Sequence, residues 1–266
     1  MSKGIALITC AKQPAIRGDL MLQASVQTDV GKMRSINQDT VFVSTEPVGP
    51  LPNLFIVADG MGGHNGGEIA STSAVACFCD HLQASGQSLT ESILDILTAA
   101  AVAANANVLS QAKISPSLSG MGTTLTACTI SDNKCTIVHI GDSRAYSVTQ
   151  NSITQLTNDH SYVSEMIKAG QLTENEARVH PKRNVLTKVL GISSDMTVDG
   201  YVYVMEPDSV ILLCSDGLYN MISEDEIKTL INTSQEDACD LVAAANDGGG
   251  ADNISVIVVR VLEVIP

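Results

Sequence analysis

The sequence has no tryptophan and only three phenylalanines and five tyrosines among its 266 residues. Proteins that bind single-stranded nucleic acid stack bases on aromatic side chains, and this chain has few to offer. Basic residues are also scarce, because 15 Lys and Arg face 29 Asp and Glu, giving a formal net charge of −14. Such an acidic surface repels a phosphate backbone, so we expect no nucleic-acid partner unless cations intervene.

The sequence also lacks a CxxC pair, and its seven cysteines are an odd number. These features argue against a disulfide framework and a zinc site, and they predict free thiols in a reducing compartment. The apolar stretch at residues 4–10 is too short for a secretory signal. No later run approaches the length of a membrane span. We therefore expect a cytoplasmic protein with no membrane partner.

Hydrophobic residues make up 44% of the chain, enough for one large domain. Residues 1–20 are expected to be an N-terminal extension, and residues 21–263 a single domain with a surface insertion at about 160–190. The strands connect mostly through hairpins, which predicts an α+β fold of antiparallel sheets with helices packed outside. The order is strands (22–28, 40–44, 54–58), helices (68–83, 90–112), strands (122–130, 134–140, 145–148, 152–156, 198–204, 210–214), helices (223–232, 235–246) and a last strand (253–262).

Aspartates recur at the ends of the apolar runs. The run Leu54–Ala58 leads into Asp59 and a glycine-rich loop, and one such pair would be no more than a turn. The pattern is repeated, however, at other strand ends beside Gly, Ser or Asn, and a further aspartate precedes the strand that begins at residue 40: Asp142, Asp216, Asp252 and Asp39. The repetition predicts a site where these strand ends meet.

Five carboxylates in one place would raise one another's pKa values and oppose folding unless a counter-charge is present. Ligands that are all oxygen favour Mg²⁺ or Mn²⁺ over zinc, copper or haem. A two-metal centre makes a bridging water nucleophilic at neutral pH and stabilises in-line displacement, usually at a phosphate ester.

With these motifs in view, the chain resembles the metal-dependent protein serine/threonine phosphatases of the protein phosphatase 2C (PPM-type) family, in its compact bacterial form. The matching stretches occur in the family's order across roughly residues 22–262: TDVGKMRSINQDT (28–40), VADGMGGHNGGEIAS (57–71), SGMGTTLTA (119–127), HIGDSRAY (139–146), LTNDHSYV (156–163), HPKRNVLTKVLG (180–191), LLCSDGL (212–218) and DNISVIVV (252–259).

The resemblance implies two packed antiparallel β-sheets flanked by pairs of α-helices, a four-layer αββα sandwich. It also implies hydrolysis of phosphoserine and phosphothreonine on proteins by a metal-bridging hydroxide, opposing a serine/threonine kinase. The implied cofactors are two Mn²⁺ or Mg²⁺ ions, with a third in bacterial members. The expected partners are phosphorylated protein substrates and a cognate kinase, and we expect a monomer.

The resemblance also assigns roles to the acidic residues. Asp59 would bridge both metals, and the Gly60 carbonyl would join one of them. Asp216 and Asp252 would complete the second metal, while Asp39 would act through metal-bound waters. Asp142, together with Asp216, matches the positions that hold the third metal.

Two basic residues receive catalytic roles in the same way. Arg34 matches the family's phosphate-gripping arginine, in agreement with the bidentate grip of guanidinium on phosphate. His64 is a candidate general acid for the leaving alkoxide. The segment 160–190 matches the flap beside the active site, which is variable and linked to substrate choice. Gln38 and Asn184 depart from the family, where many members have Glu and some bacterial members have Ser.

Several alternatives remain open at this stage. Arg34 could be a surface charge, and His64 could donate a hydrogen bond within its loop. Asp142 could pair with Arg144, and His139 is expected in the core. The whole chain could be a non-catalytic pseudophosphatase, a binding module weakened at Gln38. A two-metal nuclease would need a basic groove, which the net charge opposes.

Overall fold

The computed structural model describes residues 15–16, 21–62, 66–85, 92–234 and 236–262. His64 and most of the predicted N-terminal extension lie outside these residues, as does the helix start predicted at residues 88–91. Within the predicted extension, β1 (Ala15–Ile16) is described, and it pairs with the first long strand.

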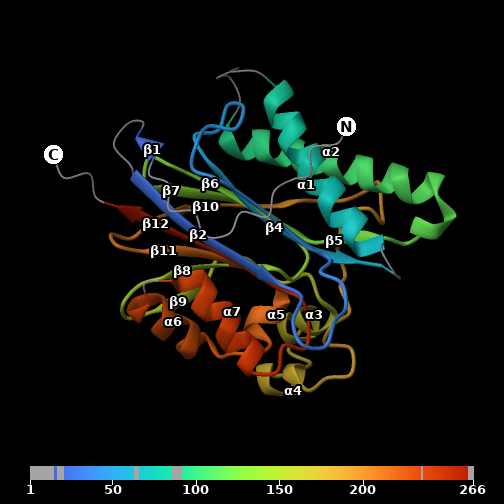
Figure 1. Cartoon of the computed structure of the whole chain (residues 1–266). Helices are drawn as coiled ribbons and strands as arrows, with labels where there is room; N and C mark the ends of the chain where they lie inside the picture. The colour runs from blue at the N-terminus through green and yellow to red at the C-terminus, as the bar shows by residue number, and fades with distance from the viewer. Residues whose placement is uncertain (1–14, 17–20, 63–65, 86–91, 235, 263–266) are drawn as a thin grey trace.

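Two antiparallel sheets form the centre of the molecule (Figure 1). The first has the order β1-β2-β12-β11-β8-β9, and the second has the order β10-β7-β6-β4-β3, with β5 pairing to β4. The remaining bounds of the first sheet are β2 (Met21–Asp29), β12 (Ile254–Leu262), β11 (Val210–Cys214), β8 (Arg144–Val148) and β9 (Ile153–Gln155). Those of the second are β10 (Asp199–Val204), β7 (Lys134–Ile140), β6 (Leu125–Ser131), β5 (Gly122–Thr123), β4 (Leu54–Met61) and β3 (Asp39–Ser44).

Helices cover the outer face of each sheet, which makes four layers (Figure 1). The second sheet carries α1 (Gly66–Ala84) and α2 (Ile93–Ile114), and the first carries α5 (Asp216–Tyr219), α6 (Glu224–Thr233) and α7 (Asp237–Asp247). Two short helices, α3 (Tyr162–Lys168) and α4 (Glu174–Arg178), lie in the segment between β9 and β10, and a 3-10 turn (Pro116–Leu118) follows α2. The predicted αββα sandwich is confirmed.

The strand β4 shows how the apolar runs build this sandwich. Successive side chains of a strand point to opposite faces. Phe55 and Val57 pack between the two sheets, whereas Ile56 and Ala58 pack against the helical layer. All four are fully buried. The run is therefore apolar at every position because both faces of the strand are covered.

By length and composition alone, α2 also meets the requirement for a membrane-spanning helix, contrary to the expectation that no run would be long enough. It is alanine-rich, and its buried stripe faces α1 and the second sheet. The core helix of a globular protein passes the same test of composition, and the stripe that packs inward includes Leu97, Ala101, Ala104 and Val108.

Of three capping patterns in the sequence, two cap helices in the structure and one does not. Thr173 and Glu176 form a capping box at α4, and the Ser223 side chain accepts from the Glu226 N–H at the start of α6. Ser234 and Asp237 have the spacing of a helix cap, but α7 begins at residue 237 and the Ser234 hydroxyl donates to Asp240 instead. The six cysteines among the described residues are free thiols, as predicted.

Candidate metal centre

The strand registers bring the five aspartates to one edge of the sandwich. In the second sheet, the β3–β4 pairing places Asp39 directly opposite Asp59. In the first sheet, Cys214 at the end of β11 pairs with Val256 on one side and with Arg144 on the other. These strands are antiparallel, so the end of β11 lies beside the starts of β12 and β8. Asp216, two residues after β11, therefore lies near Asp252, two residues before β12, and Asp142, two residues before β8.

A cavity of about 710 Å³ opens at this edge. Four of the five aspartates line it together with Gly60 and Arg34: Asp59, Asp142, Asp216 and Asp252. The fifth aspartate, Asp39, lies behind this lining, where its Oδ2 accepts a 2.7 Å hydrogen bond from the Ser215 hydroxyl. The structure thus brings together every predicted site residue that it describes.

Burial and mutual repulsion disturb the acidity of these groups. Burial, supplemented by Asp252, raises the pKa of Asp39 to about 6. Burial and the neighbouring Asp159 raise the pKa of Asp142 to about 7. The pKa values of Asp59 and Asp216 lie well above the ordinary value, through burial first and then through the surrounding carboxylates. The cluster therefore holds more negative charge than its own hydrogen bonds neutralise.

The unpaired oxygen atoms fit a hard cation. Oδ1 of Asp39 and Oδ1 of Asp216 are buried with no hydrogen-bond partner. Buried carboxylate oxygens are costly when unsatisfied, and a divalent cation with oxygen ligands would satisfy them. In the described part of the chain, no group of three or more His, Cys, Asp or Glu side chains is arranged to hold an ion unaided. Mg²⁺ characteristically completes its shell with water, and such a shell suits an incomplete set of protein ligands.

Asn253 builds the loop that carries Arg34. Its buried amide donates to the carbonyls of Val30 and Ile36 at 2.9 and 3.0 Å, and its Oδ1 accepts from the Gln38 N–H at 2.8 Å. This bonding ties residues 30–38 to the start of β12. The Arg34 guanidinium consequently reaches Asp252 at 2.7 Å, with 52% of its side chain exposed. Arg34 is therefore part of the site and not an isolated surface charge.

Asp59 and Gly60 lie in the last part of β4, which is held by close backbone packing. The Asp59 N–H donates to the Thr124 hydroxyl at 2.8 Å, and the Asp59 carbonyl accepts from the Thr123 hydroxyl at 2.9 Å. A side chain at Gly60 would lie 2.1 Å from the Gly67 carbonyl oxygen at the start of α1. Only glycine fits there, so the Asp59 backbone is fixed by the helix packed behind it.

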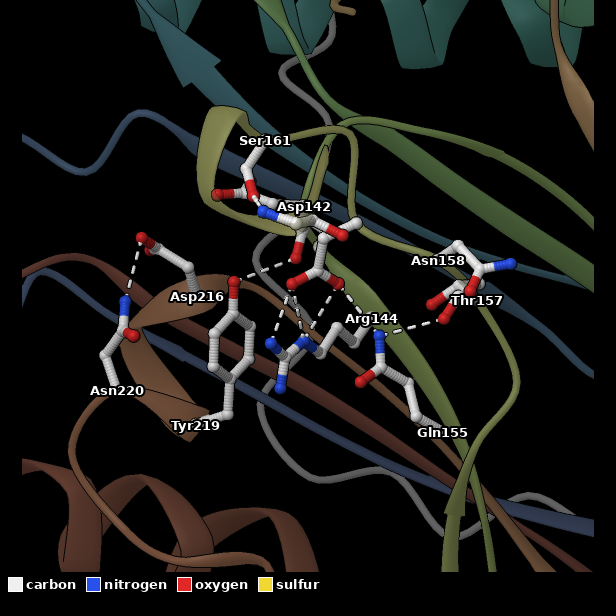
Figure 2. A network of polar contacts seen from close by, with 12 residues as sticks. Asp142, Arg144, Gln155, Thr157, Asn158, Ser161, Asp216, Tyr219 and Asn220 are labelled. Carbon is white, nitrogen blue, oxygen red and sulfur yellow. Dashed lines mark hydrogen bonds and ion pairs between the residues drawn. The ribbon is translucent and has the colours of Figure 1, made fainter. Parts of the chain in front are cut away.

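Asp142 does not form the ion pair with Arg144 that the sequence left open. The Arg144 guanidinium instead binds both oxygens of Asp159, with N–O distances of 2.7 to 3.2 Å, and donates to the Tyr146 hydroxyl at 2.9 Å. The guanidinium also stacks on the Tyr219 ring, 3.6 Å from its centroid, and the Tyr219 hydroxyl donates to the Asp142 backbone carbonyl at 2.9 Å (Figure 2). The Asp142 carboxylate is left available to the cavity.

The predicted flap contributes to the wall of the cavity. Residues 184–189 line it, and so do 192–193 and 195–197, which lie beyond the predicted flap boundary at about 190. Asn184 faces the same cavity as Asp142 and Asp216, which keeps it within the site despite its departure from the family. Gln38 also lines the cavity, so its replacement of the family's glutamate falls next to the ligands.

Two histidines have structural roles, and the core position expected for His139 is confirmed. His139 is fully buried and hydrogen-bonded to the Thr126 hydroxyl and the Asn158 carbonyl, and burial lowers its pKa to about 4. His160 orders a loop, because its Nδ1 accepts from the Gly141 N–H at 3.1 Å and its Nε2 lies 3.1 Å from Asp199. Neither histidine lines the cavity.

Sequence reasoning missed the residues that orient the ligands. Ser215 and Asn253 stand next to predicted ligands, and their small polar side chains beside Asp216 and Asp252 were a signal that could have been used. Asn220 donates to Asp216 Oδ2 at 3.1 Å from one helical turn away. Tyr219 carried no signal in one sequence, because its contact lies 77 residues away along the chain.

Comparisons with known proteins agree with this geometry. The family model "Protein phosphatase 2C" matches residues 31–235. The serine/threonine phosphatase stp of Listeria welshimeri is 36% identical over 245 residues, covering 90% of this chain and 96% of the relative. The protein phosphatase PhpP of Streptococcus pneumoniae is 37% identical over 252 residues, covering 91% and 98%.

Solved structures give the same result. The Mycobacterium tuberculosis serine/threonine phosphatase PstP/Ppp has a TM-score of 0.82 at 33% identity, covering 91% of this chain and 99% of that one. A structure of the PstP catalytic domain with two manganese ions has a TM-score of 0.80 at 32% identity, covering 92% and 100%. Fold and site together define a divalent-metal-dependent hydrolase. The chain belongs to the protein phosphatase 2C family of protein serine/threonine phosphatases.

Proposed function

We propose that the chain removes phosphate from phosphoserine and phosphothreonine with two cations, Mn²⁺ or Mg²⁺, held by its strand-end aspartates. One observation carries the proposal. The antiparallel registers gather the acidic residues at a single edge, where two of their buried oxygens have no partner. A third cation at Asp142 and Asp216 is part of the proposal, because both residues line the same cavity.

Different residues of the site have different proposed roles. Asp59, the Gly60 carbonyl, Asp216 and Asp252 would bind the cations, with Asp39 acting through water. When bound, the cations would activate a water at neutral pH and offset the charge that develops on the phosphoryl group. Arg34 is positioned to bind phosphate oxygens, since its guanidinium is at the cavity and half exposed. His64 is proposed to protonate the leaving alkoxide.

The decisive assay is phosphate release from a phosphothreonine peptide. Activity is expected with Mn²⁺, and it should be lost in EDTA and in Asp59→Asn. The matched control is Asp80→Asn, which changes an exposed aspartate of α1. Full activity in EDTA, or in Asp59→Asn, would refute the proposed centre. For His64, the test is the basic limb of the kcat pH profile, which His64→Asn should remove.

A pseudophosphatase is the second candidate, and Gln38 is the observation in its favour. Replacing the family's carboxylate by an amide removes one negative charge beside the ligands. Calorimetry with Mn²⁺ separates the two functions. A phosphatase should take up at least two ions, whereas a pseudophosphatase should show little or no high-affinity uptake.

We also propose a monomer that acts in the cytoplasm against a cognate serine/threonine kinase. The free cysteines support a reducing compartment. Analytical ultracentrifugation tests the monomer, and cell fractionation tests the compartment. A phosphoproteome comparison with and without the gene would identify phosphosites shared with a kinase, and unchanged phosphorylation would argue against an opposing kinase.

A further inference from the structure

The single turn of helix α5 begins at Asp216 and ends at Tyr219, so these two side chains project from neighbouring positions on one helical face. Asp216 lines the cavity, and its Oδ2 is held by Asn220 while its Oδ1 has no partner. Tyr219 projects toward the loop between β7 and β8, where its hydroxyl donates to the Asp142 carbonyl at 2.9 Å (Figure 2). Helix α5 therefore supplies the candidate ligand Asp216 and, through Tyr219, contacts the other candidate ligand, Asp142.

The Asp142 loop is fixed at each of its residues. Both backbone groups of Gly141 bond to His160, its N–H to Nδ1 at 3.1 Å and its carbonyl to the His160 N–H at 2.7 Å. The Ser143 hydroxyl lies 2.7 Å from that of Thr124. At Asp142, the hydroxyl of Tyr219 is the contact that links this loop to α5.

The Tyr219 ring is itself held in place. Arg144 lies 3.6 Å from the ring centroid, and both oxygens of Asp159 fix the guanidinium in that position. Because Asp159 neutralises Arg144, the guanidinium supports the ring without pairing to the Asp142 carboxylate. The stack thus sets the position of the hydroxyl and leaves the charge of Asp142 free to attract a cation.

We propose that Tyr219 is a positioning residue that sets the distance between Asp142 and Asp216 and thereby the affinity of a third cation bound by them. The proposal rests on the third-cation part of the proposed function. Removing a residue that orients a metal ligand commonly weakens metal binding by about tenfold to a hundredfold. The ions held by Asp59 and Asp252 should be unaffected, since Tyr219 has no hydrogen bond to those residues among its described contacts.

The test is Tyr219→Phe, which keeps the ring on Arg144 and removes only the hydroxyl. Mn²⁺ binding is measured by calorimetry and by the electron paramagnetic resonance signal of free Mn²⁺. The weakest of three binding steps should lose affinity about tenfold or more, with the first two unchanged. The matched control is Tyr146→Phe, which removes a tyrosine hydroxyl bonded to Arg144 but no contact to Asp142.

The possible results distinguish a failure of the Tyr219 proposal from a failure of the proposed phosphatase function. Equal third-step affinity in Tyr219→Phe and the unaltered protein overturns the proposal, and so does equal weakening in Tyr146→Phe. If the unaltered protein binds only two ions at millimolar Mn²⁺, the third cation and the role of Tyr219 both fail, while peptide hydrolysis continues to support the two-cation phosphatase. Loss of all metal binding in a still-folded Tyr219→Phe, checked by circular dichroism, also overturns the selective role of this residue.

Discussion

Without metal, replacing Asp39 by Asn should stabilise the protein at neutral pH, although Asp39 is a predicted part of the active centre. The Asp39 carboxylate is buried, has an unpartnered Oδ1 and lies opposite Asp59. Its pKa rises from 3.8 to about 6 on folding. The folded state therefore binds a proton more tightly than the unfolded state, and ionising Asp39 at higher pH costs stability.

The magnitude follows from that pKa. At about 1.4 kcal/mol for each tenfold change in proton affinity, the rise from 3.8 to about 6 corresponds to about 3 kcal/mol. The penalty is absent below pH 3.8, grows between 3.8 and about 6, and is constant above. Asn mimics the protonated carboxyl, so the variant should gain up to about 3 kcal/mol over the unaltered protein at pH 7.5 and nothing at pH 4.

The comparison must be between variants, because His139 acts with the opposite sign. Burial lowers its pKa from 6.5 to about 4, so its contribution to stability is present above pH 6.5 and is lost as the pH falls toward 4. This trend masks the effect of Asp39 in the pH dependence of either protein alone. Subtracting the two curves removes it, since His139 is the same in both.

Urea denaturation in EDTA at pH 4, 6 and 7.5 measures the difference directly, with Asp80→Asn as the control. With saturating Mn²⁺ the order should reverse, because a bound cation stabilises the folded state and the variant has lost part of its shell. If Asp39→Asn is less stable than the unaltered protein in EDTA at pH 7.5, the carboxylate is not a source of strain and the reasoning is wrong. Equal stabilisation of both proteins by Mn²⁺ would contradict it as well.

Three further changes test other parts of the site. Gln38→Glu adds a carboxylate beside the ligands and should tighten Mn²⁺ binding about tenfold by calorimetry; unchanged affinity would remove Gln38 from the centre. Arg34→Lys should lower kcat/KM for a phosphothreonine peptide about tenfold to a hundredfold, since a charged hydrogen bond contributes ~1.5–3 kcal/mol, and an unchanged value would contradict the phosphate-binding role. Asn253→Ala leaves the Val30 and Ile36 carbonyls without their buried donor, so unfolding in urea should show a loss of about 2–4 kcal/mol, and a loss below about 0.5 kcal/mol would show that the loop does not depend on it.

The sequence predicted which aspartates meet at one edge because their signal is local. An apolar run that stops at an aspartate beside Gly, Ser or Asn indicates both the strand and its end, and this held for Asp142 and Asp216, whereas β4 continues through Asp59 to Met61. The sandwich followed from hairpin spacing and helix periodicity in the same way. Pairing order was beyond such reasoning, because the insertion of β12 between β2 and β11 depends on contacts separated by more than 200 residues.

Two local patterns of the sequence are not realised in the structure. Arg144 stands two residues from Asp142, yet it binds Asp159, because the chain from β9 returns to the end of β7 and brings a better-placed carboxylate. Ser234 carried a helix-start pattern but bonds to Asp240, while α7 begins later. Arg144 binds a carboxylate that the fold brings back from the end of β9, whereas Ser234 binds a residue of the helix that follows it.

Because β12 is inserted between β2 and β11, the candidate metal centre can form only after the last strand has paired. Asp252 stands immediately before β12, and Asn253 fixes the loop of Arg34 by bonds that reach back more than 200 residues. Until that strand has been synthesised and inserted, the chain lacks Asp252, the proposed ligand, and the bonds that order the loop of Arg34. A cation shared between Asp59 and Asp252 would then join the early and late parts of the chain as a cross-link does, and it would make metal loading the last step of folding.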